Sequence, residues 1–396
     1  MPKSFRRVLF YFLLFLFILT TSLVFGYANG WSLDFRRLNW TRLGGIFIRS
    51  NPPDALITIN GSPLKSGFGS LGIGAKNGIF SKGELVSGLI PAFYDLKVQK
   101  EGYRVWEKKL EVQPGLVSSV SKINLIPESP KEVFLDFDLD DFWMVGERVV
   151  ARSKDRLFLI DDEGKKTFLR GSNVLRSDRF GRRIITASGR DVFLINLADA
   201  GSAFNLSGLF YSLKERILGL PGEVEIKESV FHPFLPDKFL FLTKKALYLL
   251  DVKKPDLQLI GASSSDRLKE LGVLYPEAEK SVIAEDGKKQ AFLNSRGSVG
   301  VLFLKDYNWD FRKKAGETEV IGKEGKIVIT FDWWNKEADH LLLNYGDELI
   351  LTEVDDRSER NQWVIGRNVK SFGQSRKGDK IYILNYAGVL KKLELD

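Results

Sequence analysis

The chain has 396 residues, of which 44% are hydrophobic and 28% charged, so we expect two or three globular domains. It has no cysteine and two histidines, which excludes disulfide frameworks, thiolate zinc sites and cysteine nucleophiles. The net charge is +8, but residues 1–43 carry +5 and residues 44–127 carry +4, which leaves −1 for the remaining 269 residues. This neutral bulk lacks the basic, aromatic-interleaved stripe of a nucleic-acid-binding protein, so we expect no nucleic-acid partner.

A long apolar stretch lies close to the N-terminus. Residues 8–25 read VLFYFLLFLFILTTSLVF, and no charged residue occurs between Arg7 and Asp34. Because about 20 helical residues span the roughly 30 Å hydrocarbon core of a bilayer, we expect a single transmembrane anchor within residues 1–30. The alternative is a cleaved signal peptide with a small-residue site at residues 26–28, although such peptides have shorter apolar cores.

Basic residues flank this stretch on both sides, with Lys3, Arg6 and Arg7 before it and Arg36, Arg37 and Arg42 after it. The first cluster is closer to the apolar core, and the free amino group adds to its charge. The positive-inside rule therefore favours a single-pass cell-membrane protein with a cytoplasmic N-terminus and an extracytoplasmic body. We expect Trp31 and Trp40 at the membrane interface.

A short strand is tightly framed in residues 50–64, SNPPDALITINGSPL. Ile57 and Ile59 alternate with a threonine, so one face of the strand can be buried. The two prolines before it keep the chain extended, and Asn60-Gly61 is a strong hairpin signal because both residues tolerate positive φ. With further strands expected at residues 45–49, 93–98 and 106–112, the segment predicts a small all-β sandwich.

Residues 44–127 resemble a PEGA domain, through GGIFIRSNPPDALITING and LIPAFYDLKVQKEGY. The residues that fit are Ser50, Pro52, Ala55, Ile59, Asn60, Gly61, Pro91, Tyr94, Gly102 and Tyr103. Asp54 stands where the family usually has glycine, and Ala92-Phe93 replaces a Pro-Gly step. The resemblance implies an extracytoplasmic or surface β module of a bacterial envelope, often beside a membrane anchor.

A glycine-rich insertion, residues 67–88, interrupts this domain. Its glycines Gly72, Gly74 and Gly78 could form a phosphate cradle only with a strand before them and a helix after them. Neither is predicted, so we expect a hairpin extension.

From residue 131 onward, pairs of short apolar strands recur. The first strands start near Val149, Ile184, Phe239, Ala291, Leu341 and Ile381, and intervals of roughly 35–55 residues suit four-stranded propeller blades. Residues 131–396 resemble WD-like and TolB-like propeller repeats, most closely at 282–292 and 331–343. The predicted fold is therefore all-β: an anchor, a PEGA-like sandwich and a β-propeller of about six blades.

The two ends of the repeat region make a further prediction. The last repeat has only three strands, and residues 132–135 form an isolated strand at the start, so we expect that strand to complete the last blade. Residues 201–222 and 263–280 do not follow the repeat, so a seventh blade remains open, and short helices are expected near 209–220 and 265–274. Two stacked β-sandwiches are the alternative architecture.

Few residues are candidates for chemistry. His232 and His340 lie in different repeats, and we expect structural roles for both. Trp333-Trp334 could stack on a sugar, but Trp333 is expected to pack between blades, while Trp334 would point the opposite way.

An acidic run could bind calcium. Asp136, Asp138, Asp140 and Glu147 stand at positions 1, 3, 5 and 12 of an EF-hand-like count. Position 6, however, is Asp141 where glycine is needed, and the interleaved apolar residues suit a strand. We therefore assign no catalytic, cofactor or metal residue, and the calcium question stays open.

These observations favour a non-enzymatic, membrane-anchored binding protein that presents a propeller at the cell surface or envelope, with an envelope protein or glycan as ligand. Two alternatives remain open. One is a glycan-active or hydrolytic enzyme that uses carboxylates in the propeller channel. The other is a structural scaffold of an envelope complex.

Overall fold

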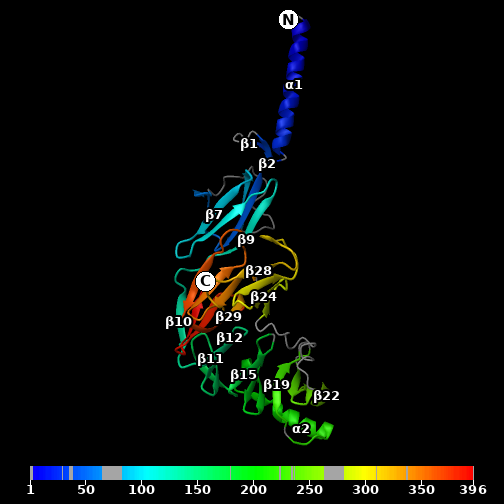
Figure 1. Cartoon of the computed structure of the whole chain (residues 1–396), viewed down its shortest axis with the longest axis vertical. Coiled ribbons are helices and arrows are strands. Elements are labelled where there is room, and N and C mark those ends of the chain that lie inside the picture. Colours follow the sequence, from blue (N-terminus) through cyan, green and yellow to red (C-terminus); the bar gives the residue numbers. More distant parts are fainter. Residues whose placement is uncertain are drawn as a thin grey trace. The chain divides into compact units, whose positions relative to one another are not determined.

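The computed structural model describes residues 3–28, 30–34, 39–64, 83–178, 180–222, 224–232, 235, 237–262, 281–308, 310–335 and 338–395 (Figure 1). The chain forms two compact units. The first consists of Met1–Ser129, Asp306–Ala315 and Asp355–Asn361. The second consists of Pro130–Lys305, Gly316–Val354 and Gln362–Asp396. The two later segments of the first unit interrupt residues 131–396, so the compact units divide the chain differently from the sequence repeats.

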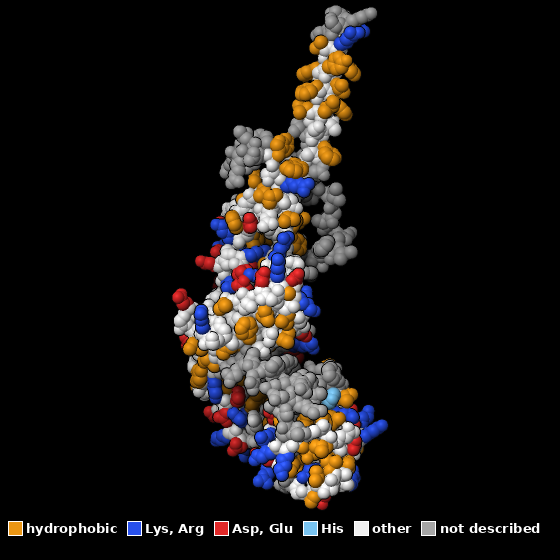
Figure 2. All heavy atoms as spheres, turned by 45° about the vertical axis from the view of Figure 1, so that its right-hand side comes forward, with side chains coloured by type: hydrophobic (Ala, Val, Ile, Leu, Met, Phe, Trp, Pro, Cys, Tyr) orange, Lys and Arg blue, Asp and Glu red, His pale blue; other side chains and the backbone are white. Residues whose placement is uncertain are grey.

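Helix α1 spans Lys3–Ala28, and its described side chains between residues 6 and 25 are exposed. Its segment Arg6–Gly26 has a mean hydropathy of 2.6 and is the one described helix long and apolar enough to cross a membrane. Apolar side chains cover the visible face of this helix in Figure 2. Exposed apolar surface costs about 25 cal/mol per Å² in water, so the helix needs an apolar environment. Length and composition fit an anchor and a signal sequence equally.

Among its described residues, the first unit contains two two-stranded hairpins, β1–β2 and β26–β27, and two larger sheets. The first hairpin pairs β1 (Trp31–Asp34) with β2 (Asn39–Arg42), and the second pairs β26 (Tyr307–Asn308) with β27 (Arg312–Lys313). One sheet has the order β6 (Glu84–Leu89), β3 (Gly44–Asn51), β9 (Val117–Asn124), with β3 and β9 parallel. The other has the order β5 (Ser62–Pro63), β4 (Leu56–Ile59), β7 (Phe93–Gln99), β8 (Trp106–Glu111), all antiparallel.

The turn chemistry of this unit follows its sequence. Asn60 and Gly61 adopt φ values of 48° and 75°, which turns β4 back into β5 as predicted. Ile57 and Ile59 are buried, while the threonine between them is not. The hairpin extension predicted for the glycine-rich insertion falls mostly on residues outside the described part of the chain. Its last residues form β6, which pairs with β3, and residues 65–82, with Gly72, Gly74 and Gly78, lie outside the described residues.

The second unit contains six four-stranded antiparallel sheets among its described residues. The first three are β11 (Asp141–Val145), β12 (Arg148–Ser153), β13 (Arg156–Ile160), β14 (Lys166–Leu169); β15 (Asn173–Ser177), β16 (Arg183–Ser188), β17 (Asp191–Asn196), β18 (Ala203–Asn205); and β19 (Ile226–Phe231), β20 (Lys238–Thr243), β21 (Ala246–Asp251), β22 (Asp256–Ala262). The next two are β23 (Ser281–Ile283), β24 (Lys289–Leu293), β25 (Val299–Phe303), β28 (Thr318–Ile321); and β29 (Thr330–Trp334), β30 (His340–Asn344), β31 (Glu348–Glu353), β32 (Gln362–Arg367).

The last sheet combines both ends of the repeat region. Its order is β33 (Val369–Gln374), β34 (Lys380–Asn385), β35 (Leu390–Glu394) and then β10 (Lys131–Asp136). Lys131 pairs with Glu394 and Val133 with Lys392, so the isolated early strand completes the last sheet as predicted. Each sheet otherwise runs in chain order, and first strands lie side by side, as β11 does with β33 and β15 with β19. This arrangement is a β-propeller.

Apolar clusters join successive sheets of the propeller. One cluster connects the sheets of β11–β14 and β15–β18 through Leu157, Leu169 and Ile184. Another packs helix α2 (Leu206–Leu218) between β17 and β20 around Phe210. Asn205 caps the start of α2 and Gly219, with φ 61°, ends it, which confirms the helix predicted near residues 209–220. The helix predicted at 265–274 lies outside the described residues.

Candidate interaction site

The two histidines lie in different sheets, in surroundings that account for both. His232 lies in the turn between β19 and β20, where its Nδ1 accepts a hydrogen bond from the Leu235 N–H at 3.2 Å. Partial burial, and to a lesser degree Lys238, lowers its pKa. His340 on β30 is 3% exposed and packs between the Trp334 and Trp363 rings. His340 Nε2 also lies 4.0 Å from Glu353 Oε1.

Three of the four acidic residues of the EF-hand-like count have partners elsewhere in the chain. Asp136 pairs with Lys166 at 2.6 Å, and Asp140 accepts a hydrogen bond from the Lys154 N–H at 2.5 Å. Glu147 accepts one from the Arg376 N–H at 3.0 Å. In the described part of the chain, no three His, Cys, Asp or Glu side chains are grouped so as to hold a metal ion.

Both adjacent tryptophans are core residues. Trp333 is 4% exposed and donates from Nε1 to the Val282 carbonyl at 2.9 Å, which joins β29 to β23. Trp334 is 6% exposed and donates from Nε1 to the Gly378 carbonyl at 3.0 Å, in the turn after β33. The two side chains point to opposite neighbours, as the strand alternation predicts, so the buried rings offer no surface for a sugar.

A polar pair lies beside these tryptophans on the first strands of two sheets. The Gln374 amide on β33 donates to the Trp333 carbonyl and to Asp332 Oδ2, the latter at 3.4 Å. Asp332 also accepts from the Trp333 N–H at 2.8 Å. Burial raises the pKa of Asp332 in spite of these hydrogen bonds, because the low-dielectric surroundings disfavour the charged carboxylate.

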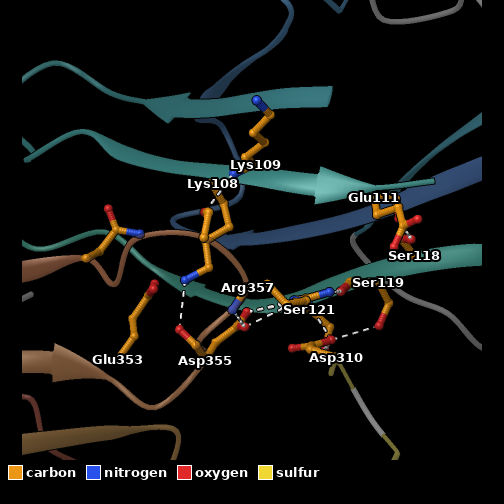
Figure 3. Close-up of polar contacts among 12 residues, drawn as sticks. Lys108, Lys109, Glu111, Ser118, Ser119, Ser121, Asp310, Glu353, Asp355 and Arg357 are labelled. Carbon is orange, nitrogen blue, oxygen red and sulfur yellow. Dashed lines mark hydrogen bonds and ion pairs between the residues drawn. The ribbon is translucent and has the colours of Figure 1, made fainter. Parts of the chain in front are cut away.

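The densest polar cluster lies in the first unit and was missed by sequence reasoning. It joins β8 and β9 to Asp306–Ala315, which includes β26 (Tyr307–Asn308) and β27 (Arg312–Lys313), and to Asp355–Asn361 (Figure 3). The Arg357 guanidinium forms a bidentate pair with Asp355, with Nη2–Oδ2 at 2.7 Å, and donates from Nη1 to the Ser119 carbonyl at 3.1 Å. The buried Lys108 ammonium donates to the Asp355 carbonyl at 3.0 Å.

This cluster covers the free edges of both sheets. On β8, the Glu107 N–H and C=O hydrogen-bond to the Asn361 side-chain amide, at 3.3 and 2.9 Å. On β9, Asp310 Oδ1 accepts from the Ser121 N–H at 3.0 Å and from the Ser119 hydroxyl at 2.8 Å. Because β8 and β9 are terminal strands of their sheets, unpaired backbone groups there could otherwise recruit another strand. The cluster therefore has a structural role.

Loop length is the one sequence signal that could have revealed it. Residues 304–317 and 354–361 separate consecutive strands of a blade, and both connections exceed the usual 2–5 residues of a hairpin loop.

The second unit presents an apolar surface that we call the Ile327 patch, formed by Ile327, Ile329 and Tyr386. Their exposed fractions are 69%, 40% and 59%. Exposed and buried side chains alternate along this segment, since Val328 between the two isoleucines is only 1% exposed. A Cβ atom at position 346 would lie 3.0 Å from Ile329 Cδ1 and 3.3 Å from Tyr386 Oη. Gly346 has no side chain, so both of these side chains can approach the same point.

Paired charges border this patch. Lys326, next to Ile327, binds Asp347 at 2.6 Å and Glu348 at 2.8 Å. Lys323 binds the same Glu348 oxygen at 2.7 Å, and these ammonium groups lower the pKa of Glu348. An apolar centre with a charged rim is the usual composition of a protein-binding surface.

No family model and no curated protein matches this chain. Among solved structures, it is similar to the β-propeller domain of Cps50 (Swd1) from Myceliophteria thermophila, with 13% identity and a TM-score of 0.29 over 65% of this chain and 83% of that one. It is also similar to the RRP9 WD40 repeats, with 11% identity and a TM-score of 0.42 over 68% of this chain and 99% of that one. A third similar structure is U3-55K, with 10% identity and a TM-score of 0.40 over 67% of this chain and 100% of that one. Likeness at this level carries no argument about function, and the strand order of the six sheets shows the propeller in this chain.

The edge-covering cluster predicts a specific cost for a charge-conserving change. Arg357→Lys keeps the positive charge but loses the bidentate pair and the bond to Ser119, so we expect the free energy of unfolding of the first unit to fall by about 1–3 kcal/mol. Faster hydrogen exchange at β8 and β9 would report the loss. Arg312→Lys, at an exposed position of the neighbouring segment, is the control. If amide hydrogen exchange at β8 and β9 were equally fast in Arg357→Lys and Arg312→Lys, Arg357 would not have the structural role assigned to it.

The buried carboxyl of Asp332 predicts a pH dependence of stability. Its pKa is raised in the folded state, so folding loses stability as the pH rises above the ordinary value of 3.8. Asp332→Asn should remove this loss, and its stability relative to the parent chain should increase with pH in urea titrations.

Asp162→Asn is the control, because its stability relative to the parent chain should decrease with pH, whereas that of Asp332→Asn should increase. A hydrogen bond from Lys380 lowers the pKa of Asp162, so that variant should be less stable near neutrality, and its deficit should shrink below pH 3.8. Parallel pH profiles for the parent chain and Asp332→Asn would contradict the assignment.

Proposed function

We propose that this chain is a membrane-anchored, non-enzymatic interaction protein of a bacterial envelope. In this proposal α1 anchors the protein, residues 44–127 are a PEGA-like sandwich, and the six sheets are the blades of a closed propeller that binds a partner protein outside the cytoplasm. The observation that carries it is the Ile327 patch, an apolar surface that would cost free energy if it stayed in water.

Four features support the parts of this proposal. The exposure and composition of α1 support membrane anchoring. Arg6 and Arg7 beside its apolar core support a cytoplasmic N-terminus, and therefore an external body. The pairing of β10 with β35 supports a closed propeller, because the strand from the start of the repeat region completes the last sheet, and a closed propeller is a rigid platform for binding. His232 and His340 each have structural partners, which favours binding over acid–base catalysis.

The predicted topology can be tested by protease treatment of intact and lysed cells. We expect the propeller to be cleaved in intact cells, or after removal of an outer membrane, and the chain to stay with the membrane fraction after alkaline extraction. A chain protected until the inner membrane is broken would reverse the orientation. Release of the chain by alkaline extraction would contradict anchoring.

The binding surface can be tested by cross-linking, because the chain has no cysteine of its own. Ile327→Cys should give a discrete heavier adduct with a short thiol-directed cross-linker in intact membranes, and adding Ile329→Glu should abolish it by placing a charge in the apolar contact. Leu259→Cys, on β22 and 54% exposed, is the control. The same adducts from both cysteines, or an adduct that survives Ile329→Glu, would rule out the Ile327 patch as the contact.

A further inference from the structure

The β1–β2 hairpin directly after α1 presents two tryptophans and an arginine on one face. Trp31 and Arg42 are direct cross-strand partners, and Trp40 lies two residues before Arg42 on the same strand. Directly opposite residues share a face of a sheet, as do residues two apart on one strand. Trp31, Trp40 and Arg42 therefore form one surface, which we call the hairpin face.

The side chains of the hairpin face are accessible. Trp31 is 37% exposed and Trp40 is 52% exposed, and Arg42 is also exposed. The Arg42 guanidinium lies 5.4 Å from the centroid of the Trp31 ring, and its Cδ lies 3.3 Å from where a Cβ on Gly115 would stand. Contact with the indole and with the Gly115 turn restricts the arginine stem, so the cation is held close to the aromatic surface.

The hairpin is tied closely to the end of the apolar helix. α1 ends at Ala28 and β1 begins at Trp31. A Cβ on Gly26, in the last turn of α1, would lie 4.0 Å from the Trp31 Cβ, so the helix end and the hairpin are in contact. The Leu43 N–H donates to the Gly30 carbonyl at 2.8 Å, which extends the pairing of the hairpin back toward the helix.

We propose that the hairpin face binds the headgroup layer of the bilayer that α1 spans, with the two indoles at the boundary of the acyl chains and Arg42 on lipid phosphate. This rests on the anchoring part of the proposed function, because a spanning α1 brings its C-terminal end, and the hairpin with it, to headgroup depth. Indoles favour that depth because they are apolar with one polar N–H, and the guanidinium fork matches phosphate oxygens. Residues 29–43, which follow α1, hold three arginines and one aspartate, and their net charge of +2 complements an anionic surface.

The consequence is a second, lateral attachment next to the anchor. With α1 as its only attachment, the first unit could rotate about the short segment between α1 and β1. A hairpin face bound to lipid headgroups restricts that rotation. Arg42 near an anionic surface contributes about 1 kcal/mol, which is about a fivefold change in the equilibrium between bound and released hairpin.

The test uses the full chain in phosphatidylcholine vesicles with and without phosphatidylglycerol. Single cysteines at Phe15→Cys in α1, Trp40→Cys in the hairpin and Leu259→Cys on β22 carry an environment-sensitive fluorophore. Lipids bearing a nitroxide in the acyl chain or at the headgroup then quench it. We expect the acyl-chain nitroxide to quench position 15. We expect the headgroup nitroxide to quench position 40 severalfold more than position 259, and to quench position 40 more strongly in the anionic vesicles.

The outcomes separate this inference from the proposed function. If the acyl-chain nitroxide quenches position 15, but the headgroup nitroxide quenches position 40 no more than position 259, the hairpin proposal is overturned and the anchor stands. Absence of quenching at position 15 would overturn both.

A second variant tests the role of the arginine. Arg42→Gln, added to Trp40→Cys, should remove most of the extra quenching in anionic vesicles, by about the fivefold factor expected for one surface cation. Arg296→Gln, at an exposed position of the second unit, should leave it unchanged. Equal quenching with and without Arg42 in the anionic vesicles would exclude phosphate binding by this residue.

Discussion

The backbone hydrogen bonds between β10 and β35 join residues 263 positions apart, as the Lys131–Glu394 pair shows. Loop-closure entropy grows only with the logarithm of loop length, so this long closure costs little more than a short one. Without it, β35 would be an edge strand and β10 an unpaired strand. The clusters between sheets presuppose the same closure, because Leu135 on β10 packs with Phe142 on β11 and Tyr382 on β34.

In each unit a buried lysine binds polar groups from a separate stretch of the chain. Lys289 is fully buried, and its ammonium binds Asp339, which precedes β30 in the next sheet, at 2.8 Å. Lys108 in the first unit is 3% exposed and binds backbone carbonyls of Asp355–Asn361. Such groups add little net stability compared with apolar side chains, but removing one partner leaves a buried charge, which typically costs about 3–5 kcal/mol. They therefore act mainly to specify which segments pack together.

The sequence predicted the parts of the fold that depend on local chemistry. Asn60-Gly61 marked a hairpin because both residues accept positive φ, and alternating apolar residues marked the strands on either side. The closing strand was also predictable, because a three-stranded last repeat leaves an edge that a strand near Lys131 can occupy. Helix α2 followed from its apolar periodicity within Leu206–Leu218.

What the sequence did not predict depends on contacts between distant residues. Apart from the length of their loops, nothing near Asp310 or Arg357 indicates that both side chains bind the edge of β9, which lies 189 and 238 residues away in the sequence. The Ile327 patch was missed for a similar reason, since Tyr386 meets Ile329 only through the register of separate sheets around Gly346. Strand alternation did predict that Trp333 and Trp334 point apart, but not that both would be buried.

The covering of β8 and β9 by late segments has a consequence for the order of biosynthesis. Both strands leave the ribosome by residue 124, whereas the segments that cover their edges follow only at 306–315 and 355–361. At about 5–20 residues per second, the edges stay open for roughly 10–50 seconds. During that interval the backbone groups at the edges of β8 and β9 can pair with strands of other chains.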